Sequence, residues 1–278
     1  MDNIFILLAI GFVIGTLGTL IGAGGGFVLV PLLLFTHPEL SPETITAISI
    51  AIVAANAISG SVAYARSGRI DYRAGLLFAL FTIPGSVLGV YTTRYIPAIV
   101  FHGLFGGLLI VLAVFLFFKK STTASEGEQL RKGKGLRHHV LTDQEKVTYR
   151  YTYNQYAGIA VSVIVGYLSP LLGIGGGIIH VPALVHWLHF PVYVATATSH
   201  FILAIMASVS VIVHLVQGTY DAPAVVRMVV GLGAGVVIGA QLGAWLSHRI
   251  KGTSIVRALA ICLALVGLRL LLGVLQGH

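Results

Sequence analysis

The sequence predicts an all-α polytopic membrane protein, built from two inverted-topology repeats of about five segments each, with glycine-broken hairpins that meet at a central site. Charged residues make up only 9% of the chain, whereas a soluble globular domain carries about 25%. Apolar runs long enough to cross a bilayer recur along the whole length. A glycine-rich motif also occurs once in each half.

Ten apolar segments, separated by polar stretches, set out the expected helices. In the first half they lie at residues 3–20, 24–36, 44–65, 74–93 and 97–118. In the second half they lie at residues 156–172, 175–189, 193–217, 224–246 and 253–275. The charged stretch between the halves contains few large apolar residues, and we expect it to be flexible. The chain thus divides into a membrane repeat at 1–118, a cytoplasmic linker at 119–154 and a second membrane repeat at 155–278.

The two halves share a sequence motif. The stretch GTLGTLIGAGGGFVLVPLL at 15–33 aligns with GYLSPLLGIGGGIIHVPAL at 166–184, and 10 of the 19 positions are identical. A Gly-x-x-Asp pattern at 68–71 is likewise repeated at 218–221, where we expect each aspartate to cap the next helix. Apolar composition alone does not produce collinear Gly, Pro and Asp matches, so we infer an internal duplication.

The charges of the loops orient the segments in the membrane. The loop RSGRIDYR at 66–73 and the linker are basic and belong in the cytoplasm, whereas the loop at 36–43 has no Lys or Arg and belongs outside. Each glycine run could interrupt one spanning helix or separate the two arms of a hairpin. The arm at 24–36 covers roughly 20 Å, which is short for a hydrocarbon core of about 30 Å. We therefore favour hairpins, which give five segments per half, an inverted second half and an external C-terminus.

The glycine runs are the first candidates for a binding site. Backbone that leaves helical geometry inside a bilayer must be satisfied by protein or by a water-filled cavity, and paired breaks in a duplicated protein indicate a site between the repeats. Exposed N–H groups followed by a helix N-terminus favour an anion. The alternative is that the glycines only permit close helix packing. The candidates are Gly24, Gly25, Gly26, Gly175, Gly176 and Gly177.

The distribution of acidic residues limits the substrate. All nine Asp and Glu lie at segment ends or in loops, whereas carriers of metal ions or organic cations usually need carboxylates within the membrane. We therefore expect an anionic or neutral substrate. The single cysteine, Cys262, and the absence of a nucleophile–base pair in the sequence argue against a metal site, a cofactor and an enzyme.

Neutral polar residues within the apolar segments complete the expected site. Hydroxyls and amides can donate hydrogen bonds to an anion, although Ser and Thr in membrane helices can equally serve helix packing. His200 stands where the first half has Ile50, and it is the first candidate for proton coupling, with His180 second. An interior histidine bonded to a neighbour is the alternative. The substrate-binding candidates outside the glycine runs are Thr16, Ser49, Asn56, Ser169, Ser199, His200 and Gln241.

The chain resembles the TauE/SafE family of sulfite exporters and 4-toluene sulfonate uptake permeases. The resemblance rests on the doubled glycine motif, on TAISIAIVAANAISGSVAYARSGRIDYR and on ATATSHFILAIMASVSVIVHLVQGTYD, and it covers nearly all of the chain outside 119–154. It implies a secondary transporter of the bacterial or archaeal cytoplasmic membrane. It also implies sulfur-containing anions as substrates, such as sulfite, sulfoacetate and other organosulfonates.

We therefore expect alternating-access transport of a small sulfur-containing anion, coupled to protons or to the membrane potential. An uncoupled anion channel, or a carrier of another small organic anion, is the alternative. The expected partners are the anionic substrate and membrane lipid, and the oligomeric state is open, with a homodimer as one option. Nucleic acid is not expected, because eight of the 17 Lys and Arg lie in the loop at 119–150, where they orient the protein in the membrane.

Overall fold

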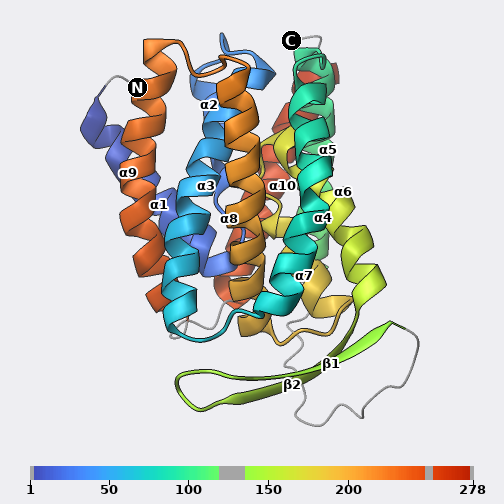
Figure 1. The fold of residues 1–278 in the computed structure, drawn as a ribbon. Coiled ribbons are helices and arrows are strands. Elements are labelled where there is room, and N and C mark those ends of the chain that lie inside the picture. Colours follow the sequence, from blue (N-terminus) through green and yellow to red (C-terminus); the bar gives the residue numbers. More distant parts are fainter. Residues whose placement is uncertain (1–2, 119–134, 248–252, 276–278) are drawn as a thin grey trace.

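A computed structural model describes residues 3–118, 135–247 and 253–275, which form ten helices and one two-stranded hairpin (Figure 1). The protein is an all-α polytopic membrane protein, and each of the ten expected segments corresponds to one helix. The helices of the first half are α1 (Ile4–Ile21), α2 (Gly26–Thr36), α3 (Pro42–Arg66), α4 (Tyr72–Thr93) and α5 (Ala98–Phe118). Those of the second half are α6 (Gln155–Leu172), α7 (Gly177–His186), α8 (Val192–Val216), α9 (Pro223–Leu246) and α10 (Thr253–Leu275).

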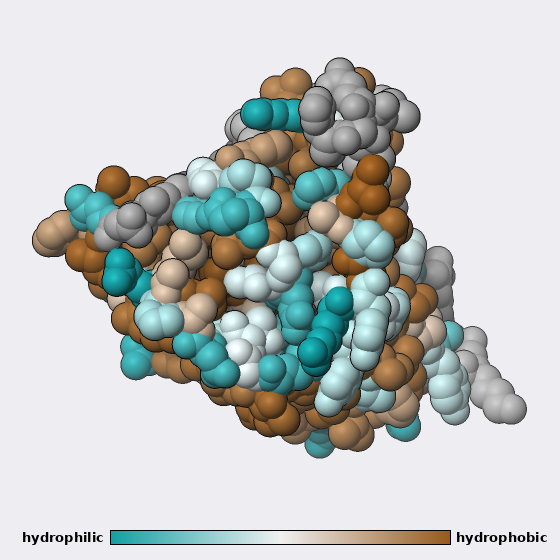
Figure 2. All heavy atoms as spheres, turned by 90° about the horizontal axis from the view of Figure 1, so that it is seen from above, coloured by the Kyte–Doolittle hydropathy of each residue, from teal (hydrophilic) through white to brown (hydrophobic). Residues whose placement is uncertain are grey.

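Seven of the described helices are long and apolar enough to cross a membrane, namely α1, α3, α4, α5, α6, α8 and α9. Seen from the end of the bundle opposite the β strands, polar side chains gather at the centre of the face, and the rim is mostly hydrophobic (Figure 2). An apolar rim around a polar end face is what a bilayer requires of a bundle that spans it.

Each glycine run ends one helix and is followed by a short helix. Gly22 closes α1 and Gly173 closes α6, both in the left-handed conformation that glycine adopts at low cost. The following helices, α2 and α7, have 11 and 10 residues and return towards the end of the bundle at which α1 and α6 began (Figure 1). The expectation of two hairpin arms at each glycine run therefore agrees with this arrangement.

The helices of each half pack on the other half in an equivalent way. The first helix of each half packs on the fourth helix of the other, as α1 on α9 and α6 on α4, and α3 packs on α8. Glycines allow the backbones to approach closely, because a side chain at Gly239 would strike the carbonyl of Phe12, and one at Gly166 would strike that of Thr82. Related halves would produce this exchange. Their inverted relationship stays a prediction.

An unexpected β hairpin lies across one end of the bundle (Figure 1). Strands β1 (Leu136–Thr142) and β2 (Thr148–Asn154) pair antiparallel, and the hairpin leads directly into α6. Its inner side chains, Leu141, Tyr151 and Tyr153, are buried in a core with residues of α4 and the start of α8. The expectation of a flexible linker is therefore wrong for residues 135–154. Residues 119–134 of the same linker lie outside the described part of the chain.

Candidate functional site

The two glycine turns touch each other at the centre of the bundle. We call residues 22–26 turn 1 and residues 173–177 turn 2. A side chain at Gly26 would strike the carbonyl oxygen of Gly173, and one at Gly177 would strike that of Gly22. A Cβ atom at Gly24 would lie 3.6 Å from the carbonyl oxygen of Gly175. The predicted meeting of the glycine-broken hairpins is thus seen as direct backbone contact.

Glycine is required in both turns by backbone conformation as well as by space. The φ angles are +79° at Gly24, +89° at Gly25, +76° at Gly175 and +45° at Gly176, a region that other residues rarely adopt. Helices α2 and α7 begin immediately after these residues, and neither has a side chain as its N-cap. Two helix N-termini, each with partial positive charge, therefore meet at a buried point.

Each turn is covered by the long helix of the other half. A side chain at Gly22 would strike Thr196 of α8, and one at Gly24 would strike Leu203 of the same helix. Turn 2 is covered in the same way by α3, where the hydroxyl of Ser49 donates to the carbonyl of Gly173 at 2.6 Å. Residues of both halves therefore enclose each turn.

A group of polar side chains lies beside turn 1. We call Thr19, Asn56, Tyr64 and His200 the polar cluster. The Thr19 hydroxyl donates to Asn56 Oδ1 at 2.6 Å, and the Tyr64 hydroxyl donates to the Thr19 carbonyl at 2.9 Å. The ring of His200 meets that of Tyr64 edge-on, with centroids 5.5 Å apart. A Cβ at Gly18 would lie 2.6 Å from Asn56 Nδ2 and 2.6 Å from the backbone nitrogen of Gly25 in turn 1. The side-chain amide of Asn56 therefore lies against the turn.

Two members of the polar cluster have buried atoms that no described residue satisfies. Asn56 Nδ2 and both ring nitrogens of His200 are fully buried, and none has a hydrogen-bond partner in the described part of the chain. An unsatisfied buried group costs about 1–3 kcal/mol, so such atoms are rare in stable proteins and call for a ligand or a water molecule. The polar cluster therefore has hydrogen-bond donors available for a ligand.

The other candidates fall into two groups. Ser169 and Ser199 are fully buried with hydroxyls that no described residue satisfies, and Ser169 lies beside Gly176 of turn 2. His180 is buried one turn into α7, with Nε2 3.4 Å from the Ser162 hydroxyl. Of these three residues, Ser169 is placed directly beside a glycine turn and can contribute to a site there.

Thr16 and Gln241 instead join helices. The Thr16 hydroxyl lies 3.2 Å from the carbonyl of Gly239, which it can bond across the α1–α9 contact. Gln241 is exposed on α9, and its Nε2 donates to the carbonyl and hydroxyl oxygens of Ser59 on α3, both at 2.8 Å. Neither contact involves a glycine turn.

Gly60 and Tyr64 lie in this region but were not among the candidates, and neither was Thr19 of the polar cluster. Gly60 makes room for the imidazole, since a Cβ there would lie 2.7 Å from His200 Cδ2, and Tyr64 supports the same ring. Both follow Asn56 at intervals of four residues, and hence lie on the same face of α3. That spacing was the available signal.

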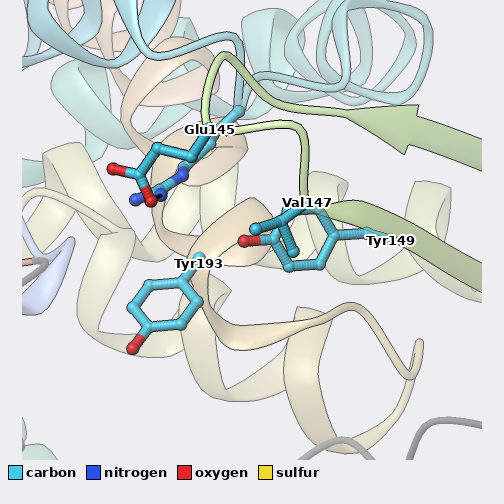
Figure 3. A pocket seen from close by; sticks show the side chains of 5 residues that line it. Glu145, Val147, Tyr149 and Tyr193 are labelled. Atoms are coloured by element: carbon cyan, nitrogen blue, oxygen red, sulfur yellow. Dashed lines mark hydrogen bonds and ion pairs between the residues drawn. The ribbon is translucent and has the colours of Figure 1, made fainter.

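A cavity of ≈ 270 Å³ opens at the hairpin end of the bundle (Figure 3). It is lined by Arg69, Glu145, Val147, Tyr149 and Tyr193. The cavity thus combines a buried cation with aromatic and acidic side chains.

Among the residues that the structure describes, no group of three or more His, Cys, Asp or Glu could hold a metal ion.

The fold defines a multi-pass protein of the cell membrane, and the comparisons with known proteins identify it as a transporter rather than an enzyme. The chain belongs to the sulfite exporter TauE/SafE family, whose sequence model matches residues 7–270. It is 31% identical to the "probable membrane transporter protein YunE" of Bacillus subtilis, over 96% of each chain. It is 28% identical to the "probable membrane transporter protein MJ0441" of Methanocaldococcus jannaschii, over 77% of this chain and 73% of the relative. No solved structure matches the chain.

Proposed function

We propose that this transporter carries a small sulfur-containing anion, such as sulfite or an organosulfonate, by alternating access through a site where the two glycine turns meet. The observation that carries the proposal is the convergence of two uncapped helix N-termini beside the unsatisfied donors of Asn56 and His200. The description of the family as sulfite exporters supports the choice of anion.

The chemistry of the site suits an oxyanion. Backbone N–H groups at helix N-termini and a side-chain amide donate hydrogen bonds to an anion without carrying a fixed charge. The anion can therefore bind and still be released, as transport requires. The buried carboxylates among the described residues, Asp71 and Asp143, are held by partners at the hairpin end and do not face the turns. An anion at the turns would therefore meet donors rather than a buried carboxylate.

Transport requires the turns to separate. In the present arrangement the carbonyls of Gly22 and Gly173 lie against Gly177 and Gly26, the first residues of α7 and α2. A movement of one half relative to the other would withdraw these oxygens and expose both N-termini to the substrate. His200 is the group for proton coupling under this proposal, because its ring is buried beside the turn and lacks a described partner.

Flux into proteoliposomes tests the proposal directly. Purified protein is expected to give saturable uptake and counterflow with sulfite or sulfoacetate, and less with sulfate, thiosulfate or taurine. Flux that follows the gradient without counterflow would show a channel and overturn alternating access. Protein that transports none of these anions, although folded by thermal unfolding, would overturn the substrate class.

A further inference from the structure

The β hairpin is anchored to the second half of the protein. Strand β2 leads directly into α6, where Asn154 Oδ1 accepts hydrogen bonds from the amides of Tyr156 and Ala157 at 3.0 and 3.2 Å. The rings of Tyr151 and Tyr153 pack on Phe190, just before α8, with centroids 4.7 and 5.0 Å apart. The ring of Phe78 on α4 joins the same core, so the hairpin packs on both halves while its chain continues into α6.

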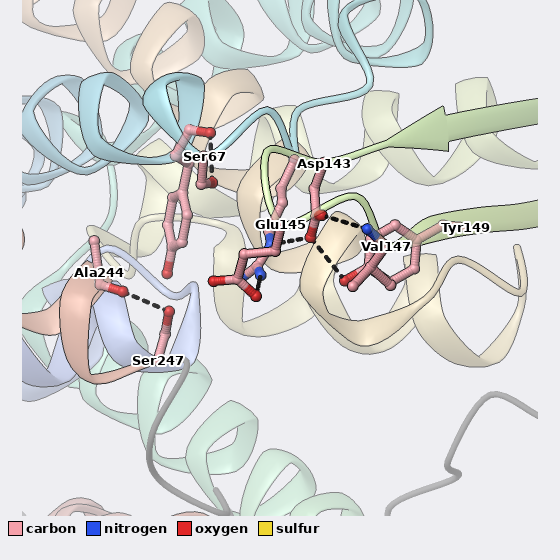
Figure 4. A network of polar contacts seen from close by, with 9 residues as sticks. Ser67, Asp143, Glu145, Val147, Tyr149, Ala244 and Ser247 are labelled. Atoms are coloured by element: carbon pink, nitrogen blue, oxygen red, sulfur yellow. Dashed lines mark hydrogen bonds and ion pairs between the residues drawn. The ribbon is translucent and has the colours of Figure 1, made fainter.

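The turn of the hairpin grips the first half at the loop between α3 and α4. The amide of Gln144 donates to the carbonyl of Ser67 at 3.1 Å. Arg69 of the same loop is 4% exposed, and its Nε donates to Asp143 Oδ2 at 3.0 Å (Figure 4). Its Nη2 also reaches Glu145 Oε2 at 3.2 Å. The contact between the hairpin turn and this loop is therefore polar and partly ionic.

The Arg69–Asp143 pair holds charge where both side chains are buried. Burial alone would raise the pKa of Asp143, but hydrogen bonds from the Val147 amide and Arg69, together with the charge of Arg69, outweigh it and lower the pKa. The guanidinium also lies over the ring of Tyr193 at the start of α8, 5.3 Å from its centroid. Desolvation offsets much of the attraction within a buried ion pair. A pair of this kind therefore contributes little to stability and instead specifies one arrangement of the segments that it joins.

Asp71 joins the hairpin, α4 and α8. Its carboxylate caps α4 by accepting from the amide of Ala74 at 3.0 Å, as the sequence predicted. The same carboxylate accepts from the Tyr151 hydroxyl at 2.7 Å and from His139 Nδ1 at 2.6 Å. Its own amide donates to the hydroxyl of Thr198 at 3.0 Å, next to Ser199 and His200. The contacts of Asp71 therefore reach α8, the helix that carries Ser199 and His200 of the proposed site.

The equivalent loop at the other end of the bundle is built differently. Thr219 stands where the first half has Arg69, and the expected cap by Asp221 is wrong, because α9 begins after Ala222 with no side-chain cap. The Tyr220 hydroxyl instead donates to the carbonyl of Ala47 at 2.8 Å. The duplicated loops therefore differ where one of them meets the hairpin.

We propose that the β hairpin is the gate of the transport path at its end of the bundle, held closed by Arg69 and Asp71 of the first half. The proposal rests on the proposed function, since it gives the movement of the halves a specific contact to break. Opening releases the hairpin turn from the α3–α4 loop, and the ≈ 270 Å³ cavity beside Arg69 then widens into the path.

A disulfide between the hairpin and the loop tests the gate. In a Cys262→Ser background, Ser67→Cys with Gln144→Cys joins residues whose backbones are hydrogen bonded. Oxidation is expected to abolish transport, and reduction is expected to restore it. The matched control, Thr142→Cys with Thr148→Cys, cross-links paired residues within the hairpin and should transport in both states. A fully cross-linked Ser67–Gln144 variant that transports at the reduced rate would overturn the gate.

A second experiment needs no substrate, so it separates failure of the gate from failure of the proposed function. Arg69→Met with Asp143→Asn removes the Arg69–Asp143 ion pair, one of the two contacts that hold the gate, without leaving a buried charge unpaired. A membrane-impermeant thiol reagent applied at the hairpin end should then label Ser199→Cys several-fold faster than in the parent protein. Labelling that is unchanged, or that rises equally from both ends, would overturn the proposal.

Discussion

The two glycine turns have nearly the same backbone but different surroundings. Turn 1 and turn 2 both place a left-handed glycine at the end of one helix, two glycines with positive φ at the break and a proline five residues after the last glycine. Beside turn 1, however, lie the four side chains of the polar cluster, with buried atoms that no described residue satisfies.

The equivalents of the polar cluster in the other half are apolar at the decisive positions. Met206 stands where the first half has Asn56, and Ile50 stands where the second half has His200. Both pack in a buried apolar group with Val53 and Leu203 between α3 and α8. The two halves thus share the backbone that makes two helix N-termini meet, while a buried amide and imidazole lie beside turn 1 and the hydroxyl of Ser169 lies beside turn 2. We infer that turn 1 recognises the substrate and that turn 2 supplies backbone and closure.

The largest expected effect is on the shared backbone. Gly26→Ala would press a methyl group on the carbonyl of Gly173, and Gly177→Ala would press one on that of Gly22. Backbone cannot yield as a side chain can, so each change should cost about 1–3 kcal/mol of stability and reduce transport to background. Flux and thermal unfolding measure the two effects.

Gly103→Ala is the control, because a Cβ there meets no atom within 4 Å, and it should transport normally. If Gly26→Ala abolishes transport and Gly177→Ala does not, the equivalence of the two turns is wrong.

The next effect should appear at turn 1 alone. Asn56→Leu removes an amide donor beside the turn, and a hydrogen bond to a charged group contributes about 1.5–3 kcal/mol, which corresponds to roughly a tenfold to a hundredfold weaker binding. Met206→Leu changes the equivalent position without removing a donor. We expect the KM of uptake to rise only in Asn56→Leu. Equal effects of both substitutions would contradict the assignment of recognition to turn 1.

A smaller and more selective effect is expected from His200. His200→Gln keeps a hydrogen-bonding side chain but cannot change its charge between about pH 5 and 8. Uptake should therefore lose its pH dependence while its maximum rate falls only a few-fold, as measured in proteoliposomes across that range. His180→Gln is the matched control, because His180 is also buried but lies beside Ser162. An unchanged pH profile in His200→Gln would assign the coupling elsewhere.

The sequence predicted the membrane segments more fully than the site. Apolar length and the left-handed preference of glycine act locally, and so the ten segments and both breaks could be placed from the chain alone. The approach of Gly60 and Tyr64 to His200, by contrast, depends on how α3 packs against α8, and no local pattern encodes that packing. The hairpin was not predicted, because its alternating inner residues, such as Tyr151 and Tyr153, lie in a charged stretch, and the charges indicated a flexible linker.

The smallest effects should come from two candidates that the structure places away from the turns. Thr16→Ala removes a hydrogen bond between α1 and α9, and Gln241→Ala removes the two that its amide donates from α9 to Ser59 of α3. Hydrogen bonds between membrane helices contribute about 0.6 kcal/mol on average, so each change should lower the unfolding temperature slightly. Neither should alter the KM of uptake by more than about twofold, because neither group contacts a glycine turn. A tenfold rise in KM for Gln241→Ala, with unchanged stability, would instead place its amide in the path of the substrate and extend recognition beyond turn 1.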